Sequence, residues 1–201
     1  MQITSHAFKS NSVTALANPD LQRAMGNVEQ GFIGKRQKAV DALPEFDALR
    51  DSAVAIKQHT LKHLDLYIEA YAAKVEAAGG TVHFAEDADH AKAIFLAIAR
   101  RRGAKTVTKG KTMVSEEIGL NAFLEANGIV PVETDLGEYI IQLRGEHPSH
   151  IIAPAVHLTR EQVEADFRRV HTHLDPLRNL TEPVTLLSEA RTILRQKYAE
   201  A

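Results

Sequence analysis

The segment TVTKGKTMVSEEIGLNAFLEANGIVPVE, residues 106–133, decides the fold of this chain. It opens with a short β-prone run at 106–108 and closes with another at 129–132, just after Gly128. Between the two runs, residues 116–126 have the pattern of a helix, and glycine directly after a helix is a common stop. A strand, a helix and a strand in this order predict parallel strands joined by a crossover helix. We therefore expect an α/β fold with an open, mostly parallel sheet.

The alternation of strands and helices continues in both directions from this segment. Upstream, residues 81–84 form another β-prone run, and Asp87 or Asp89 can cap the helix that follows it. Downstream, residues 149–153 are a fourth strand candidate, after which Thr159 is placed to cap a helix. These elements extend the parallel sheet predicted for the central segment.

Helical spacing dominates the N-terminal part of the chain. Residues 14–40 contain few strand formers, and Pro44 stands where the first turn of a second helix would begin. Apolar residues then recur every three or four positions up to the pair Gly79-Gly80, which ends the helical pattern. We expect residues 1–80 to form an N-terminal helical extension and residues 81–201 to form the α/β domain.

Charge and composition exclude several classes of protein. The 201 residues include 24 lysines and arginines against 26 aspartates and glutamates, so no strong field attracts nucleic acid. No apolar run approaches the about 18 residues of a membrane-spanning helix, and the first residues lack the apolar region of a signal peptide. Cysteine is absent, which excludes thiolate metal sites and cysteine-ligated clusters in this chain. We expect a cytoplasmic protein without a nucleic-acid partner.

The run Gly110-Lys111-Thr112 after a predicted strand invites comparison with a phosphate-binding loop. The pattern of such a loop requires a glycine five positions before Gly110, and Lys105 stands there instead. Two glutamates in the first turn of the next helix would also repel a phosphate. The sequence therefore does not predict a nucleotide site of this kind.

Charged residues gather where two of the predicted strands end. The candidate residues for a binding site are Lys109, Lys111, Thr112, Glu133, Asp135 and Glu138. Ligands of open α/β sheets bind at the carboxyl ends of the strands, which favours a site here if the two strands are neighbours. The alternative is that the lysines belong to an ordinary solvated turn and the acids to a solvated face or a helix cap. Residue types alone leave both interpretations open.

Five histidines within 27 residues suggest a metal site. They are His147, His150, His157, His171 and His173. Side chains on one face of a strand need even offsets, which suits positions 147 and 157 but not position 150. We favour surface and hydrogen-bonded histidines and expect no metal in this chain.

Three segments carry a family resemblance. They are TKGKTMVSEE at 108–117, ETDLGEYIIQL at 133–143 and PSHIIAPAVH at 148–157. In order and spacing they resemble the LUD (lactate-utilization) domain of component B, the iron–sulfur component of bacterial L-lactate oxidation systems. Residues 18–21 and 34–36 also look like component B and unlike the shorter component C. The resemblance covers essentially the whole chain.

The resemblance implies a fold, a function and partners. The fold is similar to ribose-phosphate isomerase and CoA-transferase domains, the NagB/RpiA/CoA-transferase-like type. The function is oxidation of L-lactate to pyruvate together with the other lactate-utilization components, with [4Fe–4S] clusters on cysteines downstream of position 201 in the full-length protein and no cofactor here. We expect an interaction domain that is not catalytic by itself. The alternatives are a site for an anionic carboxylate or a sugar phosphate, and an oligomerisation module built on the N-terminal helices.

The resemblance also implies that the C-terminal part of the domain is missing from this chain. A truncated sheet leaves a strand edge and an apolar face uncovered, and such surfaces recruit partners. We therefore expect self-association, either by strand pairing or through the last helix at 184–198. The apolar contact would come from Leu186, Leu187, Ile193 and Leu194.

Overall fold

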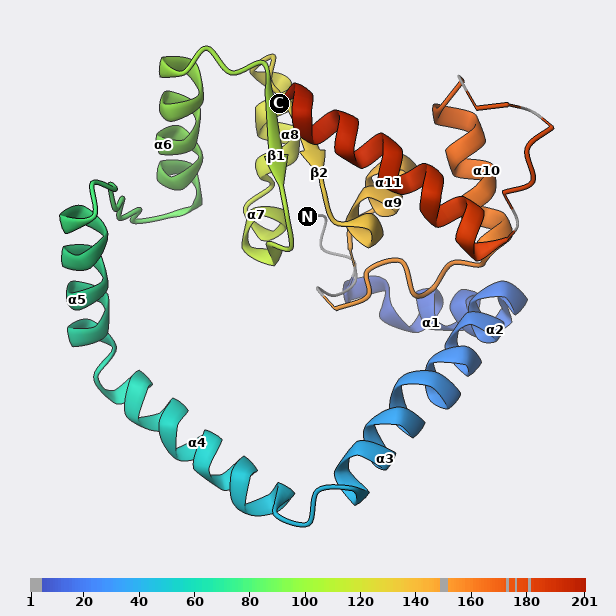
Figure 1. Ribbon diagram of the computed structural model, residues 1–201, viewed down its shortest axis with the longest axis horizontal. Helices are drawn as coiled ribbons and strands as arrows, with labels where there is room; N and C mark the ends of the chain where they lie inside the picture. The colour runs from blue at the N-terminus through green and yellow to red at the C-terminus, as the bar shows by residue number, and fades with distance from the viewer. Residues whose placement is uncertain (1–4, 149–151, 173, 176, 181) are drawn as a thin grey trace. The chain divides into compact units, whose positions relative to one another are not determined.

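The computed structural model describes residues 5–148, 152–172, 174–175, 177–180 and 182–201 (Figure 1). The chain divides into two compact units. One consists of Met1–Val28 and Asp87–Ala201, and the other is Glu29–Glu86. The predicted binding-site residues all fall in the first unit.

A parallel two-stranded sheet lies at the centre of the first unit. Strand β1 (Thr106–Lys109) pairs with β2 (Val130–Glu133), so that Lys109 stands opposite Glu133 in the register. Both strands and their parallel pairing confirm the prediction from the central segment. The sheet has two strands in the described part of the chain, fewer than the sequence pattern suggested.

Two short helices connect the strands in place of the single helix expected at 116–126. Helix α7 (Met113–Glu117) ends before Gly119, which has a positive φ of 67°, and α8 (Leu120–Ala126) begins directly after it. A left-handed residue is incompatible with a continuous α-helix, and glycine adopts this conformation without steric penalty. The break turns α8 so that Leu120 and Leu124 are buried beside the sheet.

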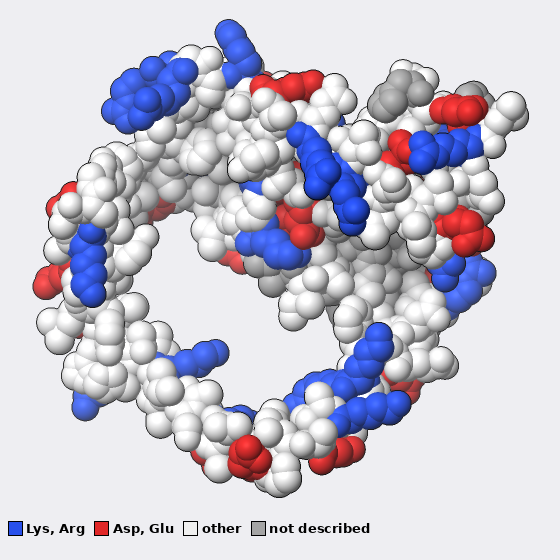
Figure 2. Space-filling model, viewed as in Figure 1, with Lys and Arg blue, Asp and Glu red and all other residues white. Residues whose placement is uncertain are grey.

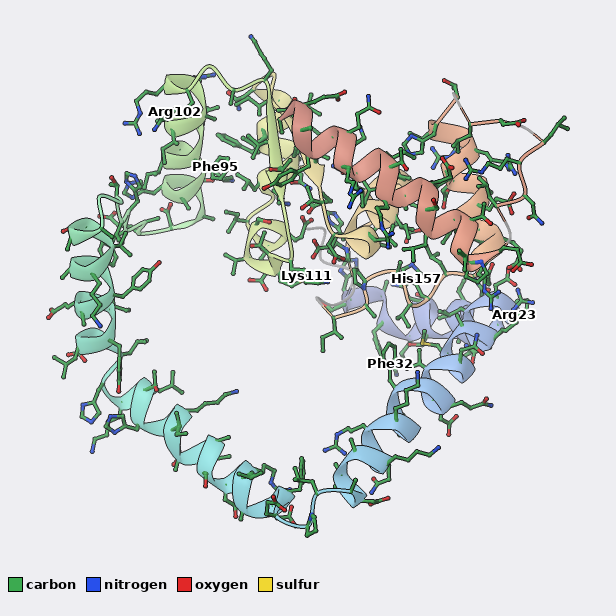
Figure 3. The ribbon with its side chains drawn as sticks, viewed as in Figure 1. Arg23, Phe32, Phe95, Arg102, Lys111 and His157 are labelled. Atoms are coloured by element: carbon green, nitrogen blue, oxygen red, sulfur yellow. The ribbon has the colours of Figure 1, made fainter. Side chains whose placement is uncertain are left out.

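Helix α6 (Ala88–Arg101) covers this end of the sheet through a small apolar cluster. Ala99 packs there with Leu120, Leu124 and Ile129. The side chain of Asp87 accepts a hydrogen bond from the His90 main chain, which confirms one of the two predicted caps. Three arginines, residues 100–102, lie at the end of the helix. Figure 2 shows Lys and Arg side chains gathered over α6, and Figure 3 labels Arg102 there. Their charge is favourable at the negative end of α6.

The larger core of the first unit lies among three helices downstream of β2. They are α9 (Leu136–Arg144), α10 (Arg160–Val170) and α11 (Pro183–Glu200). Tyr139, Phe167, Leu180 and Ile193 meet in this core. The predicted cap of α10 is confirmed as a full capping box, because Thr159 and Gln162 exchange side-chain and main-chain hydrogen bonds.

The N-terminal region is helical, as its spacing predicts. The first unit includes the short turn Ser5–Ala7, α1 (Phe8–Ala17) and α2 (Pro19–Val28). The second unit contains the π-helical turn Glu29–Ile33, followed by α3 (Gly34–Asp41), α4 (Phe46–Lys62) and α5 (Leu64–Ala77). Helix α4 starts at Phe46, so the prediction that Pro44 occupies the first turn is wrong by two residues. Neither α4 nor α5 has a buried residue.

Two further sequence expectations need correction. Residues 81–84 are not a strand, and the side chain of Phe84 is 64% exposed. A β-prone run becomes a strand only where a neighbour pairs with it, and no pairing partner of this run occurs among the described residues. The strand expected at 149–153 falls mostly on residues outside the described part, and Ile152 and Ala153 themselves are not in a strand.

Helix α11 is not free to cover a second copy in the way that its sequence suggested. Ile193 is buried in the core of α9 and α10, and Leu186 and Leu194 pack against the same core. Of the four residues expected to make that contact, Leu187 alone is exposed, at 46%. Most of the apolar stripe of α11 therefore packs against the core of its own chain. Among the described residues, no helix combines the length and the apolar character that crossing a membrane requires.

Candidate functional site

The ends of β1 and β2 bring two of the predicted residues into direct contact. The Lys109 ammonium lies 2.6 Å from a carboxylate oxygen of Glu133, and both side chains are buried. The parallel register causes this contact, because the two residues end their strands at the same level. The sequence predicted that these strand ends converge, and the structure confirms that they do.

Residues of the crossover helices complete the surroundings of Lys109. Its ammonium lies 2.8 Å from Oε1 of Glu116 and 2.7 Å from Oδ1 of Asn121. Asn121 also donates its amide to Glu133 at 3.1 Å. A lysine ammonium has three N–H donors, so these three acceptors saturate it. The charge of Lys109 is therefore neutralised by carboxylates within the protein.

Lys111 stands in a left-handed conformation, with φ of 40°, in the loop after β1. Its main-chain N–H donates to Oε2 of Glu138 at 2.9 Å, and its ammonium lies 2.9 Å from Asp135. Figure 3 labels Lys111 in this loop, beyond the end of β1. Non-glycine residues rarely adopt positive φ, and such residues concentrate at functional sites. The contact with Glu138 holds the loop against the start of α9.

Two of the predicted site residues have clear structural roles. Thr112 caps α7 by accepting from the Ser115 main chain, and Asp135 caps α9 by accepting from Gly137. Capping of this kind stabilises a helix by about 1 kcal/mol. Cap formation, which the sequence left open as the alternative for the acidic residues, applies to Asp135.

Glu138 differs from the other carboxylates because it is buried without an ion pair in the described part of the chain. Its residue exposure is 5%, and its hydrogen-bond partner there is the Lys111 main chain. Burial raises the pKa of Glu138 above its ordinary value, the Lys111 N–H opposes that rise, and the charges of Glu133 and Asp135 add to it. A buried acid with a shifted pKa is a candidate for acid–base or binding work.

A pocket of about 210 Å³ opens beside these residues. Its polar lining consists of Glu116, Asn121, Glu125, Glu133, Glu138, Gln142, Glu146 and His147. Glu133 and Glu138 were predicted from the sequence as site residues, whereas Glu116, Asn121 and Gln142 were not. No sequence signal marks these three, because they stand on helices whose rotation depends on the Gly119 break and on the packing of α9.

The three histidines of this group that the structure describes have separate partners. His157 lies 2.9 Å from Glu146, His171 shares a 3.1 Å hydrogen bond with Tyr139, and His147 lies 3.8 Å from Glu116. His150 and His173 lie outside the described residues. Within the described ranges, no group of three or more histidines, aspartates and glutamates converges closely enough to hold a metal ion.

Comparisons with known proteins place the chain in a family. The family described as LUD domain matches residues 68–201, which include both strands and the whole pocket. Lactate utilization protein B of Bacillus subtilis is 36% identical over 202 residues, covering 100% of this chain and 41% of that protein. Lactate utilization protein B of Bacillus licheniformis is also 36% identical to this chain, and the matched region covers 42% of that protein.

A relative from Escherichia coli carries a different name. The uncharacterized electron transport protein YkgF is 41% identical over 194 residues, which are 96% of this chain and 39% of YkgF. The chain thus spans about two fifths of the length of the curated relatives that it matches. No solved structure matches it. The match over residues 68–201 and the similarity along its full length show that this chain belongs to the LUD domain family.

Proposed function

We propose that this chain is the N-terminal part of a lactate-utilization protein B and serves the oxidation of L-lactate to pyruvate. The observation that carries the proposal is its similarity to proteins named Lactate utilization protein B over 100% of its length. The name of YkgF adds electron transport as the type of chemistry. We place this activity in the cytoplasm.

Within that protein, we propose that residues 81–201 act as an interaction domain for the other lactate-utilization components and residues 1–80 as its helical extension. The [4Fe–4S] clusters would belong to the part of the longer protein beyond this chain, because this chain has no cysteine to ligate them. Charged and apolar surfaces of the LUD domain would then position the cluster-bearing part against its electron donor.

A gene deletion tests the function. In the host of this protein, with any separate lactate dehydrogenase genes removed, deletion of the gene should abolish growth on L-lactate as the carbon source. Growth on pyruvate should continue, because pyruvate enters metabolism after the proposed step. A plasmid copy of the gene should restore growth on L-lactate. Undiminished growth of the deletion strain on L-lactate would contradict the proposal.

A second function, small-molecule binding, has the pocket in its favour. We propose that the residues named from the sequence, which are Lys109, Lys111, Thr112, Glu133, Asp135 and Glu138, form or frame the binding site. The supporting observation is that five of them make contacts of 2.6–2.9 Å with one another at the strand ends, beside a pocket of about 210 Å³. A ligand that binds the folded state raises the unfolding temperature, so a thermal-shift series tests it.

A further inference from the structure

We propose that the pocket between α8, β2 and α9 binds a small organic cation that donates hydrogen bonds, such as a primary ammonium group. The inference deepens the second proposed function and rests on it. A pocket of about 210 Å³ suits a small molecule, since sites for drug-sized ligands start at about 300 Å³.

The charge of the lining determines the sign of the ligand. Three buried or nearly buried carboxylates, Glu116, Glu133 and Glu138, line the pocket, and the first two share the ammonium of Lys109. That ammonium donates to three protein acceptors at 2.6–2.8 Å and has no donor left for an anion. An anionic carboxylate or phosphate would therefore meet negative charge without a compensating partner.

The hydrogen-bonding capacity of the lining determines which groups the ligand carries. The amide of Asn121 already donates to Glu133, and the amide of Gln142 donates to the Pro131 carbonyl at 2.8 Å. Both donors of the Asn121 amide, which also contacts Glu116 at 3.4 Å, and one of the two donors of Gln142 are thus engaged by the protein. The lining therefore offers mainly acceptor oxygen, and a ligand that supplies donors suits it best.

Glu138 provides the open acceptor. The residue is only 5% exposed. In the described part of the chain, only its Oε2 has a hydrogen-bond partner, which is the Lys111 N–H. No buried side-chain oxygen among the described residues lacks a partner. The second oxygen of Glu138 is therefore not fully buried, and Glu138 is one of the residues that line this pocket.

The same geometry argues against a metal ion as the occupant. Glu116 and Glu133 converge on the Lys109 ammonium, which already occupies the point between them. Among the described residues, no three acidic or histidine side chains are placed to hold a metal ion. Separated acceptors instead suit an ammonium group, whose N–H bonds point in different directions. His147, which lies 3.8 Å from Glu116, also lines the pocket, and its side chain is 56% exposed.

Calorimetric titration of the intact chain at fixed ionic strength tests this inference. Four probes are titrated: ethylammonium, tetramethylammonium, L-lactate and inorganic phosphate. Ethylammonium should bind saturably. Tetramethylammonium carries the same charge but no N–H donor, so it should bind at least about tenfold more weakly. This pair of cations needs no variant and separates hydrogen bonding from general charge attraction.

Two variants locate the site. Glu138→Gln keeps the shape of the side chain and an acceptor for the Lys111 N–H but removes the charge, and it should weaken ethylammonium binding at least about tenfold. Glu117→Gln is the matched control, because Glu117 is exposed and does not line the pocket. It should leave binding unchanged. Circular dichroism of both variants verifies that they are folded.

Each contrary result has a distinct meaning. Binding of L-lactate or phosphate in place of ethylammonium would overturn the cation inference and leave small-molecule binding standing. Equal binding of both cations, or full binding by folded Glu138→Gln, would overturn the role of Glu138. Absence of binding by all four probes would overturn the inference and remove the support for the second function, without bearing on the lactate-utilization proposal.

Discussion

At the scale of single residues, Lys109 and Lys111 use their charges differently. The Lys109 side chain is 5% exposed and lies between two carboxylates, whereas the Lys111 side chain is 49% exposed and pairs with Asp135. Removal of one partner from a buried ion pair leaves an uncompensated charge, while an exposed pair is screened by water. The same substitution at these two lysines, two positions apart, should therefore cost very different amounts of stability.

Lys109→Met should destabilise the chain by about 3–5 kcal/mol, because Glu116 and Glu133 then face each other without a cation. Lys111→Met is the control and should cost less than about 1 kcal/mol. Urea unfolding of the two variants beside the parent chain measures the difference. Equal stability losses would show that the Lys109 cluster does not hold the strand ends together.

Glu138→Gln predicts a pH-dependent gain in stability. Burial raises the pKa of Glu138 in the folded state, so the folded chain binds more protons than the unfolded chain between about pH 4.5 and the raised pKa. The stabilising contribution of Glu138 is present below about pH 4.5 and is lost as the pH rises through the raised pKa. At pH 7 the glutamine variant, which buries no charge, should melt at a higher temperature than the parent chain.

The thermal advantage of Glu138→Gln should shrink on acidification toward pH 4. Differential scanning calorimetry at several pH values measures it, with the exposed Glu117→Gln as the control that should change little at any pH. A constant offset between Glu138→Gln and the parent chain across this range would contradict the assignment. An advantage that shrinks on acidification would instead identify Glu138 as a residue that lowers stability at neutral pH, which is common at functional sites.

At the scale of secondary structure, the sequence predicted the elements with strong local signals. The caps at Asp87 and Thr159 were predictable because a side-chain oxygen at the start of an apolar periodic run satisfies local N–H groups. The prediction of a strand at 81–84 was wrong because strand formation depends on a pairing partner far along the chain. The Gly119 break was missed because a glycine within a helical pattern signals an interruption only weakly.

The candidate site was predictable to the same extent. Lys109 and Glu133 follow from strand ends that meet in a parallel pair, which is a property of topology. Asn121 and Gln142 depend on how α8 and α9 turn their faces toward the sheet, and tertiary packing sets that rotation. The sequence thus predicted where the pocket would lie but not which helical side chains line it.

Gly137, at the start of α9, has no room for a side chain. A Cβ atom there would lie 2.9 Å from Cγ of Pro154, a fully buried residue. Gly137→Ala should therefore destabilise the chain by about 1–3 kcal/mol through overpacking. Gly26→Ala is the control, because Gly26 lies within α2 with nothing within 4 Å of the added carbon. It should stabilise the chain by about 0.5–1 kcal/mol, the usual gain of alanine over glycine in a helix. Thermal unfolding that ranks the two variants in the reverse order would contradict this packing.

At the scale of the whole molecule, the absence of cysteine from all 201 residues limits redox chemistry. Anaerobic reconstitution of this chain with iron and sulfide should leave it colourless after desalting, because [4Fe–4S] clusters are held by cysteine thiolates. A longer protein that contains this chain and supplies cysteines should become brown under the same conditions. A stoichiometric cluster spectrum on the 201-residue chain would refute the prediction and require ligands of another type.

The pairing of Lys109 with Glu133 across the register also limits how this sequence can evolve. Either residue alone is costly to exchange, since its partner would remain buried with an unbalanced charge. Joint replacement of an ion pair by apolar residues of similar volume is often tolerated in proteins, but here it requires two mutations in one lineage and leaves Glu116, the other carboxylate at Lys109, without its cation. Drift at these two positions should thus proceed by rare concerted steps, and descendants of this sequence should either keep both residues or have exchanged both.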